Sequence, residues 1–323
     1  MSWSVVVPTN RPDRFKSFTE AWTPLFQKHD VALFVVQDSE PWDFDYSGFI
    51  ATADSWPFPD FIPSKTDMCR SLGIHRAWKA GTTYTLSLDD DVLPEGDIFD
   101  EYERVFEAGA PCSEYLSVGS LTSYGGQLRG FPFADRSPAD VAIQYGGWNG
   151  VLDYDAPTQL AGVRGSEGFS PVVLPVPRGA AVTTCIMNAA WRTEYAPIMW
   201  QLPLLDGRFN RFGDIWSGLF QKRVLDALGK VMVINGKASV RHERASDPLA
   251  NLEREAPGIP LNEEVWSFLA ESVRRLDGGE HKSMVDAFKC VTEWAYFYFG
   301  RKDDLDYAEH FCKCRDEWLA LFS

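Results

Sequence analysis

Residues 84–91 read YTLSLDDD, an apolar segment that runs directly into three consecutive aspartates. A short apolar run closed by polar residues is typical of a buried β-strand. Because alternate side chains of an extended backbone point the same way, Asp89 and Asp91 can face one ligand while Asp90 faces elsewhere. Paired carboxylates suit Mg²⁺ or Mn²⁺, with phosphate oxygens completing the shell. The segment predicts a strand that ends at a divalent metal site, and the alternative is a solvated acidic turn.

Two earlier strands are expected to end in polar residues in the same way. Residues 3–7 form a continuous apolar run followed by Thr9, and residues 31–36 form another, followed by Asp38. Between them, residues 13–28 carry apolar side chains at helical spacing, which completes a β-α-β unit. Parallel strands separated by helices predict an open, doubly wound sheet that binds ligands beyond the carboxyl ends of its strands. Thr9, Asp38 and the aspartate triplet should therefore meet at one sheet edge.

The remaining segments give weaker local signals. Residues 39–63 are rich in proline, aspartate and aromatics without periodicity, which predicts a loop region. A helix is expected to begin near residue 64 or 67, and residues 231–234 are expected to form a short strand. From residue 262 onward the pattern is helical, with a turn at residues 277–280 as the best candidate joint before the last helices.

Composition limits the classes of partner and compartment. The 323 residues suffice for one large domain, or for one domain with a helical appendage. A net charge of −15 argues against a nucleic-acid partner, because DNA and RNA are bound mainly through Lys and Arg. The apolar run at the N-terminus is too short for a signal peptide or a membrane span. The six cysteines lack zinc-ribbon spacing, so we expect reduced thiols and a cytoplasmic location.

A series of longer motifs, ordered along the chain from Val5 to about Glu255, points to a known family. The most specific is DYDAPTQL at residues 153–160. The others are VPTNR at 7–11, VQD at 36–38, KTDMCR at 65–70, DDD at 89–91, RGFPF at 129–133, CIMN at 185–188, RFGDIWSG at 211–218 and HERASDP at 242–248. Together they resemble the reversibly glycosylated polypeptides of plants, which include the UDP-arabinopyranose mutases (glycosyltransferase family 75).

The resemblance implies a GT-A type fold, an α/β architecture with a Rossmann-like, doubly wound mixed sheet. Residues 1–260 would form the catalytic domain that binds the nucleotide-sugar. Residues 261–323 would form a C-terminal helical extension packed on it. An Asp-x-Asp motif after a strand is common among GT-A glycosyltransferases, and neither a P-loop nor a G-x-G-x-x-G fingerprint occurs in the sequence.

Three functions are open at this point. The leading interpretation is a metal-dependent mutase that interconverts UDP-arabinopyranose and UDP-arabinofuranose, with self-glycosylation as a by-product or an intermediate. The second is a glycosyltransferase that passes a sugar from a UDP-sugar to an external sugar or glycan acceptor. The third is a nucleotide-sugar-binding subunit without turnover. An acidic surface and a helical tail are compatible with a homo-oligomer.

The resemblance also implies roles on the nucleotide side. Thr9 and Arg11 are assigned to the base or ribose, and Asp38 to the uracil or ribose edge, with a helix N-cap as the alternative for Asp38. Lys65 and Arg70 could reach phosphate or sugar. Arg70 could instead form an ion pair with its near neighbour at position 67.

Metal binding is assigned to Asp89, Asp91 and His242, and nucleotide binding also to Asp89 and Asp90. A late histidine commonly completes the metal site of the GT-A fold, and imidazole is an acceptable ligand for Mn²⁺. Without the resemblance, His242 would be interpreted as an exposed histidine in a charged loop. The expected cofactor is Mn²⁺ or Mg²⁺.

Catalysis is assigned to Arg129, Arg136 and Asp214. Guanidinium stays protonated and is a poor nucleophile, so the two arginines are expected to grip the pyrophosphate or the sugar as charge develops. Asp214 is expected to contact an acceptor or to act as a base, and it could also cap a helix. The family usually has two aspartates where this chain has Gly213 and Asp214, which puts one carboxylate role in doubt.

Asp153 and Asp155 are the last pair of candidate residues. Paired carboxylates accept hydrogen bonds from sugar diols, so both are assigned to the substrate. Equally, they could fix a loop through Asx-turns.

Overall fold

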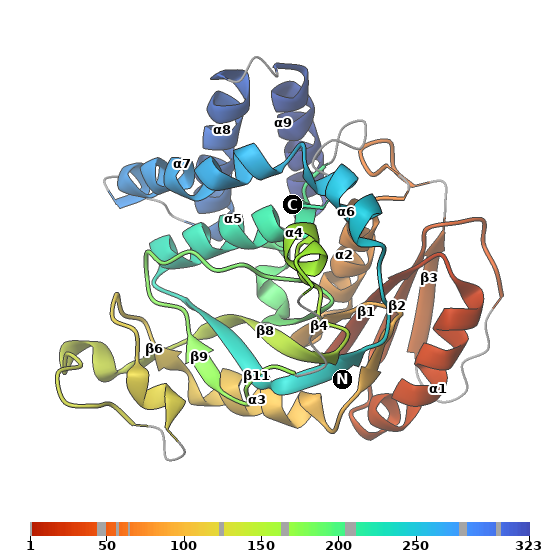
Figure 1. Cartoon of the computed structure of the whole chain (residues 1–323), viewed down its shortest axis with the longest axis horizontal. Helices are drawn as coiled ribbons and strands as arrows, with labels where there is room; N and C mark the ends of the chain where they lie inside the picture. The colour runs from red at the N-terminus through yellow and green to blue at the C-terminus, as the bar shows by residue number, and fades with distance from the viewer. Residues whose placement is uncertain are drawn as a thin grey trace.

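The computed structural model describes residues 2–43, 50–55, 58–63, 65–122, 126–162, 168–203, 211–277, 283–301 and 305–323. Within these residues, nine strands form one mixed sheet in the order β3-β2-β1-β4-β10-β8-β11-β5, with β9 paired to β11 (Figure 1). The predicted α/β class with a doubly wound mixed sheet and a helical C-terminal region is confirmed.

The parallel half of the sheet follows the sequence prediction closely. Strands β1 (Trp3–Thr9), β2 (Ala32–Gln37) and β4 (Tyr84–Leu88) lie parallel, with β1 in the middle. The prediction of a loop over residues 39–63 is wrong in part, because β3 (Ile50–Ser55) pairs with β2 at the sheet edge. This strand carries a single large aliphatic residue, so pairing with its neighbour decides its structure and its own sequence gives no strand pattern.

The second half of the sheet is built from later segments. Strand β10 (Asn188–Arg192) lies antiparallel between β4 and β8 (Val141–Gly150), and β8 is parallel to β11 (Val231–His242). The short strand expected at residues 231–234 is only the beginning of β11, which continues through an irregularity after Asn235. The two edge partners of β11 are β5 (Val92–Pro94) and β9 (Val173–Pro175).

Helices cover both faces of the sheet, as alternation along β1 requires. Val5 and Val7 pack toward α1 (Pro12–Lys28) and α3 (Ile98–Ala108), whereas Val6 packs toward α2 (Arg70–Ala80). Gly73 lets α2 approach β1 closely, since a Cβ there would lie 2.5 Å from Val6 Cγ1. The helix expected near residue 67 begins as a 3₁₀ turn, η1 (Asp67–Cys69), which leads into α2.

Four further helices and several short elements complete the chain. Helix α5 (Gly213–Leu228) lies on the same face as α2, and α7 (Ile259–Asp277), α8 (Met284–Arg301) and α9 (Leu305–Ala320) stack above it (Figure 1). The short elements are α4 (Ala156–Leu160), α6 (Pro248–Glu255), β6 (Ala110–Pro111), β7 (Pro138–Ala139), η2 (Val118–Leu121), η3 (Ala134–Arg136) and η4 (Thr193–Ile198).

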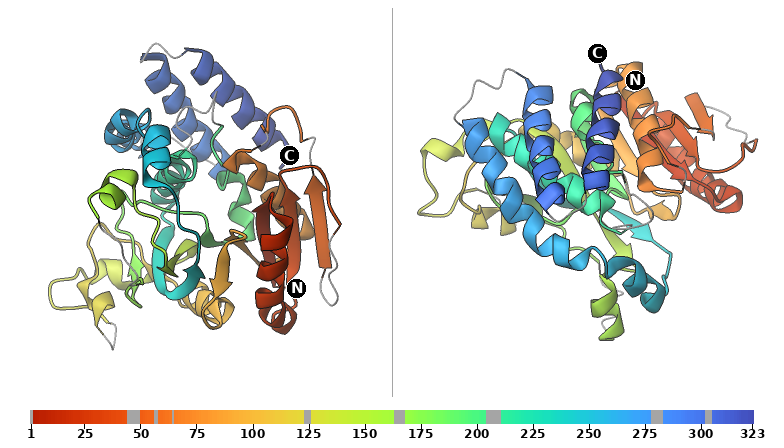
Figure 2. Two further views of the ribbon diagram at one scale, coloured as in Figure 1. Left: turned by 45° about the vertical axis from the view of Figure 1, so that its right-hand side comes forward. Right: turned by 90° about the horizontal axis from the view of Figure 1, so that it is seen from above.

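The C-terminal helices stack on the side of α5 that faces away from the sheet (Figure 2). They share one hydrophobic core with the sheet domain. Phe311 of α9 packs against Phe220 of α5 with ring centroids 6.0 Å apart, and Trp200 packs edge-on against Phe288 of α8 at 6.2 Å. The division at residues 260/261 stays a prediction, although α7 begins close to it. The expected joint begins at Asp277, where α7 ends, and its residues 278–280 lie outside the described part. No described helix is long and apolar enough to cross a membrane.

Candidate active site

An open cavity of about 1130 Å³ lies beyond the carboxyl ends of β1, β2 and β4. This is where an open sheet of this kind binds its ligands. One wall comes from these strand ends and from η1, and the other from α4, α6, the residues before β10 and the start of α5. The candidate residues that line it are Thr9, Arg11, Asp38, Lys65, Arg70, Asp89, Asp90, Asp153, Asp155 and Asp214.

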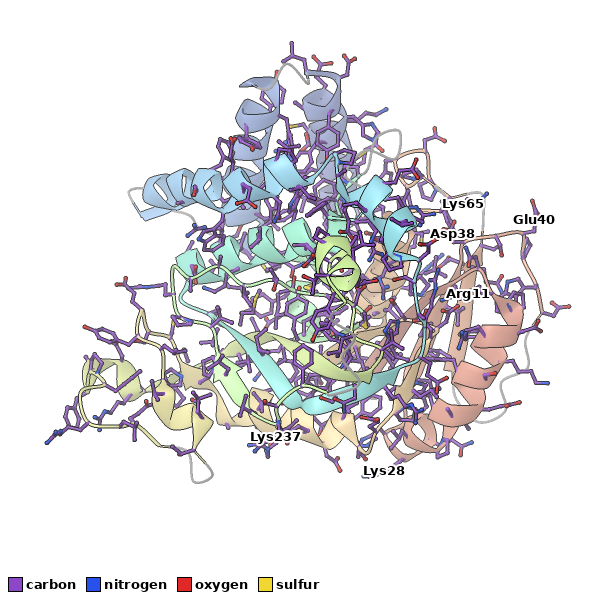
Figure 3. The ribbon with its side chains drawn as sticks, viewed as in Figure 1. Arg11, Lys28, Asp38, Glu40, Lys65 and Lys237 are labelled. Atoms are coloured by element: carbon purple, nitrogen blue, oxygen red, sulfur yellow. The ribbon has the colours of Figure 1, made fainter. Side chains whose placement is uncertain are left out.

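Asp38 and Lys65 face each other at the β2 end of the cavity (Figure 3). Asp38 is buried, and its Oδ1 has no hydrogen-bond partner among the described residues. Burial raises the pKa of its carboxyl, while the backbone N–H and the charge of Lys65 lower it in part. The described residues after Asp38 are not helical, so the helix N-cap alternative is wrong. A buried acceptor without a partner is suited to a donor group of a ligand.

Asp90 is held by the end of β1. Its Oδ2 accepts a 2.6 Å hydrogen bond from Thr9 Oγ1 and a 3.2 Å bond from Arg11 Nε, and Arg11 Nη2 contacts its Oδ1. Both carboxylate oxygens of Asp90 are thus engaged within the protein. Thr9, Arg11 and Asp90 act as a brace between β1 and β4, and their assigned contacts with a nucleotide stay predictions.

Arg70 forms a buried ion pair with Asp89. One guanidinium nitrogen, Nη2, contacts Asp89 Oδ1, and Nη1 contacts Ser87 Oγ and lies 3.4 Å from the Leu88 carbonyl oxygen. The alternative ion pair of Arg70 with Asp67 is therefore not the one formed. The pair fixes Asp89 at the cavity wall, where a third of its side chain (34%) remains exposed. The cavity wall therefore carries a carboxylate and a guanidinium side by side.

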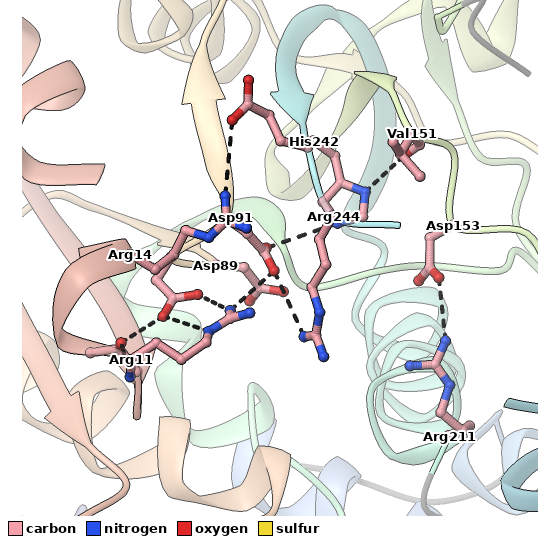
Figure 4. Close-up of polar contacts among 12 residues, drawn as sticks. Arg11, Arg14, Asp89, Asp91, Val151, Asp153, Arg211, His242 and Arg244 are labelled. Atoms are coloured by element: carbon pink, nitrogen blue, oxygen red, sulfur yellow. Dashed lines mark hydrogen bonds and ion pairs between the residues drawn. The ribbon is translucent and has the colours of Figure 1, made fainter. Parts of the chain in front are cut away.

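Asp91 and His242 meet at the other side of the triplet (Figure 4). His242 Nδ1 lies 2.7 Å from the Val151 carbonyl oxygen, and Nε2 lies 3.9 Å from Asp91 Oδ1. A carbonyl oxygen only accepts hydrogen bonds, so Nδ1 donates to Val151, and Nε2 is the ring nitrogen on the side of Asp91. Two guanidinium groups also face Asp91, with Arg11 Nη2 at 3.0 Å and Arg244 Nη1 at 3.8 Å from Oδ2.

Asp91 and His242 offer a divalent cation two donors, a carboxylate and an imidazole, while Arg11 and Arg244 already face Asp91 Oδ2. A carboxylate and an imidazole whose outer nitrogen is fixed by a backbone carbonyl are the arrangement that Mn²⁺ sites use. Of the three predicted ligands, the structure brings Asp91 and His242 together and pairs Asp89 with Arg70. The assignment of all three to a metal stays a prediction.

A second group of potential ligands lies outside the cavity. His29, Asp97 and Asp100 place their ligand atoms within 4.8 Å of one another. Lys28 Nζ already binds both aspartates, at 2.6 and 3.0 Å, and Asp97 caps the N-terminus of α3. These contacts explain the group as a structural link between α1 and α3.

Asp214 lies on the opposite wall, in the first turn of α5. Phe212 occupies the N-cap position, and the Asp214 carboxylate accepts from the backbone N–H of Ile215 at 3.0 Å. Desolvation, and then the carboxylates of Asp67, Asp153 and Asp89, raise the pKa of Asp214 to about 7. A carboxyl with this pKa exists in both protonation states near neutral pH, which is the property of a general acid and base.

Asp153 and Asp155 have different surroundings. Asp155 is the N-cap of α4, because its Oδ1 and Oδ2 accept from the backbone N–H and the hydroxyl of Thr158, each at 2.9 Å. The loop-fixing alternative is thus observed for Asp155. Asp153 Oδ1 lies 3.3 Å from Arg211 Nη2, and the same guanidinium faces Glu255, with Nε 3.7 Å from Oε1. Their assigned contacts with sugar hydroxyls stay predictions.

Arg129 and Arg136 do not line the cavity. Both belong to the segment between β6 and β7, where Arg129 is exposed. The Arg136 guanidinium stacks on the Phe133 ring at 3.6 Å and donates to the Phe131 carbonyl oxygen at 3.0 Å. The structure therefore separates these two arginines from the other candidates, and their catalytic role stays a prediction.

Sequence reasoning assigned no role to several residues of the cavity. The cavity is also lined by Asp67, Arg211, Arg254 and Glu255. The charge of Asp67 raises the pKa of Asp214, and the Asp214 carboxylate is one of the charges that raise the pKa of Arg211. The motif around position 211 was a signal for Arg211, and only packing reveals the other three. On the same wall, Trp148 packs against Phe169 with ring centroids 4.5 Å apart.

An α/β protein with a mixed sheet and an open polar cavity beyond its strand ends is the class that the fold and the site define. Asp89 and Asp90 of the acidic triplet line this cavity, whereas Asp91 and His242 are not among its lining residues. A family model described as reversibly glycosylated polypeptide matches residues 121–322. The chain belongs to this family.

Curated relatives and solved structures give the degree of similarity. The chain is 30% identical over 285 residues to UDP-arabinopyranose mutase 1 of Oryza sativa subsp. japonica, covering 82% of this chain and 76% of that protein. It is 29% identical over 285 residues to UDP-arabinopyranose mutase 1 of Arabidopsis thaliana, covering 82% and 77%. A partial likeness exists to glucosyl-3-phosphoglycerate synthase from Mycobacterium tuberculosis, solved with Mn²⁺, UDP-glucose and phosphoglyceric acid (TM-score 0.43, 16% identity, 82% of this chain and 79% of that chain).

Proposed function

We propose that this chain is a UDP-sugar mutase that interconverts UDP-arabinopyranose and UDP-arabinofuranose. The observation that carries the proposal is the 30% identity over 285 residues to a protein named as such a mutase. The strand-end cavity supports it, because its polar residues suit a nucleotide-sugar and its volume of about 1130 Å³ is ample for one.

Ring interconversion sets a specific chemical demand. In the pyranose form of arabinose the ring oxygen is O5 and O4 is a hydroxyl, whereas in the furanose form these roles are exchanged. The bond from C1 to one oxygen breaks, the bond from C1 to the other forms, and one proton moves from the new ring oxygen to the old one. The C1–O bond to UDP breaks for this exchange and re-forms when UDP is recaptured, so no atom is gained or lost overall. The proton transfer between the two sugar oxygens needs a group that both accepts and donates a proton near neutral pH.

Asp214 meets this demand. Its pKa of about 7 lets it take a proton from one hydroxyl and return it to the other. Because Asp67 and Asp153 contribute to this pKa, they tune the proton transfer without touching the proton themselves. The Arg70–Asp89 ion pair lies on the strand-end wall, opposite Asp214. It would bind sugar hydroxyls and phosphate oxygens from that side.

The nucleotide and a divalent cation would occupy the strand ends. Asp38 is a candidate for the uracil or ribose edge, given its unpartnered oxygen, and Lys65 is a candidate for phosphate or sugar. Asp91 and His242 would hold Mn²⁺ or Mg²⁺, which would offset the charge of the pyrophosphate as UDP leaves. The residues of this chain would supply the rest by orienting the sugar.

A specific feature favours a second candidate function, glycosyl transfer to an external sugar or glycan acceptor. The wall formed by Trp148 and Phe169 offers aromatic surface of the kind on which sugar rings stack. The volume of the cavity leaves room beside one nucleotide-sugar.

The cytoplasmic location and the homo-oligomer stay predictions. The six cysteines, all of which are described, form no disulfide.

The proposal is tested by incubating the purified protein with UDP-arabinopyranose and Mn²⁺ and separating the nucleotide-sugars by chromatography. We expect UDP-arabinofuranose to accumulate, and Asp91→Ala to reduce the rate by at least about 10²-fold because the pyrophosphate charge is left unbalanced. Formation of free UDP that rises when a sugar acceptor is added, with no furanose, would favour the transferase. Absence of any turnover or binding would reject both functions.

A further inference from the structure

Arg211 is a charged residue of the cavity to which the proposed reaction gives no role. It lines the cavity on the same wall as Asp214, which follows it by three residues. Together with Asp153 it lies apart from the group of side chains around Asp91 (Figure 4). A third of its side chain (33%) is exposed, so part of the guanidinium is accessible from the cavity.

The backbone next to Arg211 is fixed by the packing of Phe212. The Phe212 ring stacks on Trp216 with ring centroids 5.3 Å apart. It also packs directly against the backbone at Gly258, since a Cβ there would lie 2.4 Å from Phe212 Cδ2. These contacts anchor the start of α5, so Arg211 and Asp214 are held in a fixed relation to each other.

The Arg211 guanidinium has loose partners within the protein. Its Nη2 lies 3.3 Å from Asp153 Oδ1 and its Nε lies 3.7 Å from Glu255 Oε1, whereas a well-formed charged hydrogen bond measures about 2.7–2.9 Å. Among the described residues, Asp153 is its one hydrogen-bond acceptor. By contrast, Arg76 on α2 donates twice to Asp54, at 2.8 and 3.1 Å. Arg211 therefore keeps donor capacity that a ligand can use.

The charges around Arg211 indicate which kind of group it binds. Burial lowers the pKa of its guanidinium, and four carboxylates more than offset this: Asp153, Glu255, Asp214 and Asp67. A phosphate brought to Arg211 would be repelled by these carboxylates, whereas a neutral hydroxyl would not. The surroundings of Arg211 thus suit the sugar and not the pyrophosphate.

We propose that Arg211 is a substrate-binding residue, which donates to the same sugar hydroxyl whose proton Asp214 takes. This inference rests on the proposed function, because it requires a nucleotide-sugar in the cavity. A hydroxyl has one donor hydrogen and two acceptor lone pairs, so a guanidinium and a carboxylate together satisfy both of its capacities. As the O–H bond breaks, its proton passes to Asp214 and its electron pair forms the new bond to C1. Arg211 stabilises the negative charge that develops on the oxygen meanwhile.

Calorimetric titration of the full chain with UDP and with UDP-arabinopyranose, both with Mn²⁺, tests the proposal. We expect Arg211→Ala to weaken binding of UDP-arabinopyranose at least about tenfold and to leave UDP affinity within about twofold, because UDP has no sugar to lose. Retained UDP affinity also shows that the variant is folded. The matched control is Arg76→Ala, which removes an ion-paired arginine outside the cavity and should change neither affinity.

Chemical rescue supplies a second measurement that a structural role would not affect. Millimolar guanidinium chloride should restore part of the conversion rate of Arg211→Ala and should have no such effect on Asp214→Asn. Equal weakening of UDP and UDP-arabinopyranose binding, or an effect no larger than that of Arg76→Ala, would overturn the proposal. A wild type that shows the Arg211-dependent difference in binding but forms no UDP-arabinofuranose would overturn the mutase function alone.

Discussion

Asp214 combines a raised pKa with a position at the cavity wall, and both properties can be tested in one variant. Asp214→Asn keeps the shape of the side chain but removes the proton carrier. We expect the rate of UDP-arabinose interconversion to fall by at least about 10²-fold, because general acid and base catalysis contributes on this scale. The pH dependence of the wild-type rate near its pKa of about 7 should be absent from the residual activity of the variant.

The same substitution should stabilise the protein at high pH. The unfolded carboxyl ionises near 3.8, whereas the folded one keeps its proton to about 7, so wild-type stability falls as the pH rises between these values. Asn cannot ionise, so the melting temperature of Asp214→Asn should exceed that of the wild type at pH 8 and match it near pH 4. Glu293→Gln, an exposed site on α8, controls for the loss of one charge from an acidic chain. An equal gain in melting temperature at pH 8 in both variants would contradict the explanation that ionisation of the buried Asp214 carboxyl lowers stability.

Residues that follow a strand directly were predictable from the sequence. Thr9, Asp38 and the aspartates at 89–91 each end an apolar run, so topology alone brings them to one edge. Asp67 and Glu255 could not be found this way, because they reach the cavity from η1 and α6 through the packing of helices. Arg129 was proposed from a strong motif and lies on the exposed segment between β6 and β7, outside the lining of the cavity, so its catalytic role stays a prediction.

At the scale of elements, α5 is tied to its surroundings by a buried ion pair. Lys222 Nζ contacts Asp226 Oδ1 and donates to the Pro177 carbonyl oxygen at 3.0 Å, and Asp226 Oδ2 accepts from the Gly179 N–H at 3.0 Å. Burial lowers the pKa of Lys222 and raises that of Asp226, and each charge offsets this effect on the other. The pair joins α5 to the segment that leads into the second wall of the cavity.

Asp226→Ala should therefore destabilise the protein strongly. It leaves a buried ammonium and a backbone N–H without their partner, which costs about 3–5 kcal/mol of unfolding free energy. Urea denaturation followed by circular dichroism measures this. The matched control is Asp140→Ala, which removes the partner of Lys230 at the surface and should cost less than about 1 kcal/mol. Similar losses of unfolding free energy in the two variants would contradict the expectation that the buried pair stabilises the protein more than the exposed pair does.

Elements were predictable where the local pattern was complete. The β-α-β unit and the helical C-terminal region have clear apolar periodicity, and the structure confirms them. The edge strand β3 was missed because its residues are small and polar. The predicted strand at residues 231–234 is shorter than β11 because Gly236 and Lys237 interrupt the apolar run, although pairing with β8 resumes at Val240.

For the whole molecule, the fold follows from a sheet that brings distant segments to one cavity. The sequence of the first hundred residues already implies the parallel half of that sheet and its binding edge. The antiparallel insertion of β10 and the pairing of β6 with β7 depend on contacts between segments far apart in the chain, so no local pattern predicts them. The proposed function rests at this scale on family membership together with a polar cavity whose volume suits a nucleotide-sugar.

The central claim is that one cavity carries the sugar between its two ring forms, and approach to equilibrium from both sides tests it most directly. Separate reactions would start from UDP-arabinopyranose and from UDP-arabinofuranose, each with Mn²⁺ and equal amounts of protein, and would be sampled by chromatography until no further change occurs. We predict that both reach the same ratio of the two nucleotide-sugars with little free UDP. Two different end points, or consumption of either sugar nucleotide to UDP without the other ring form, would contradict the account.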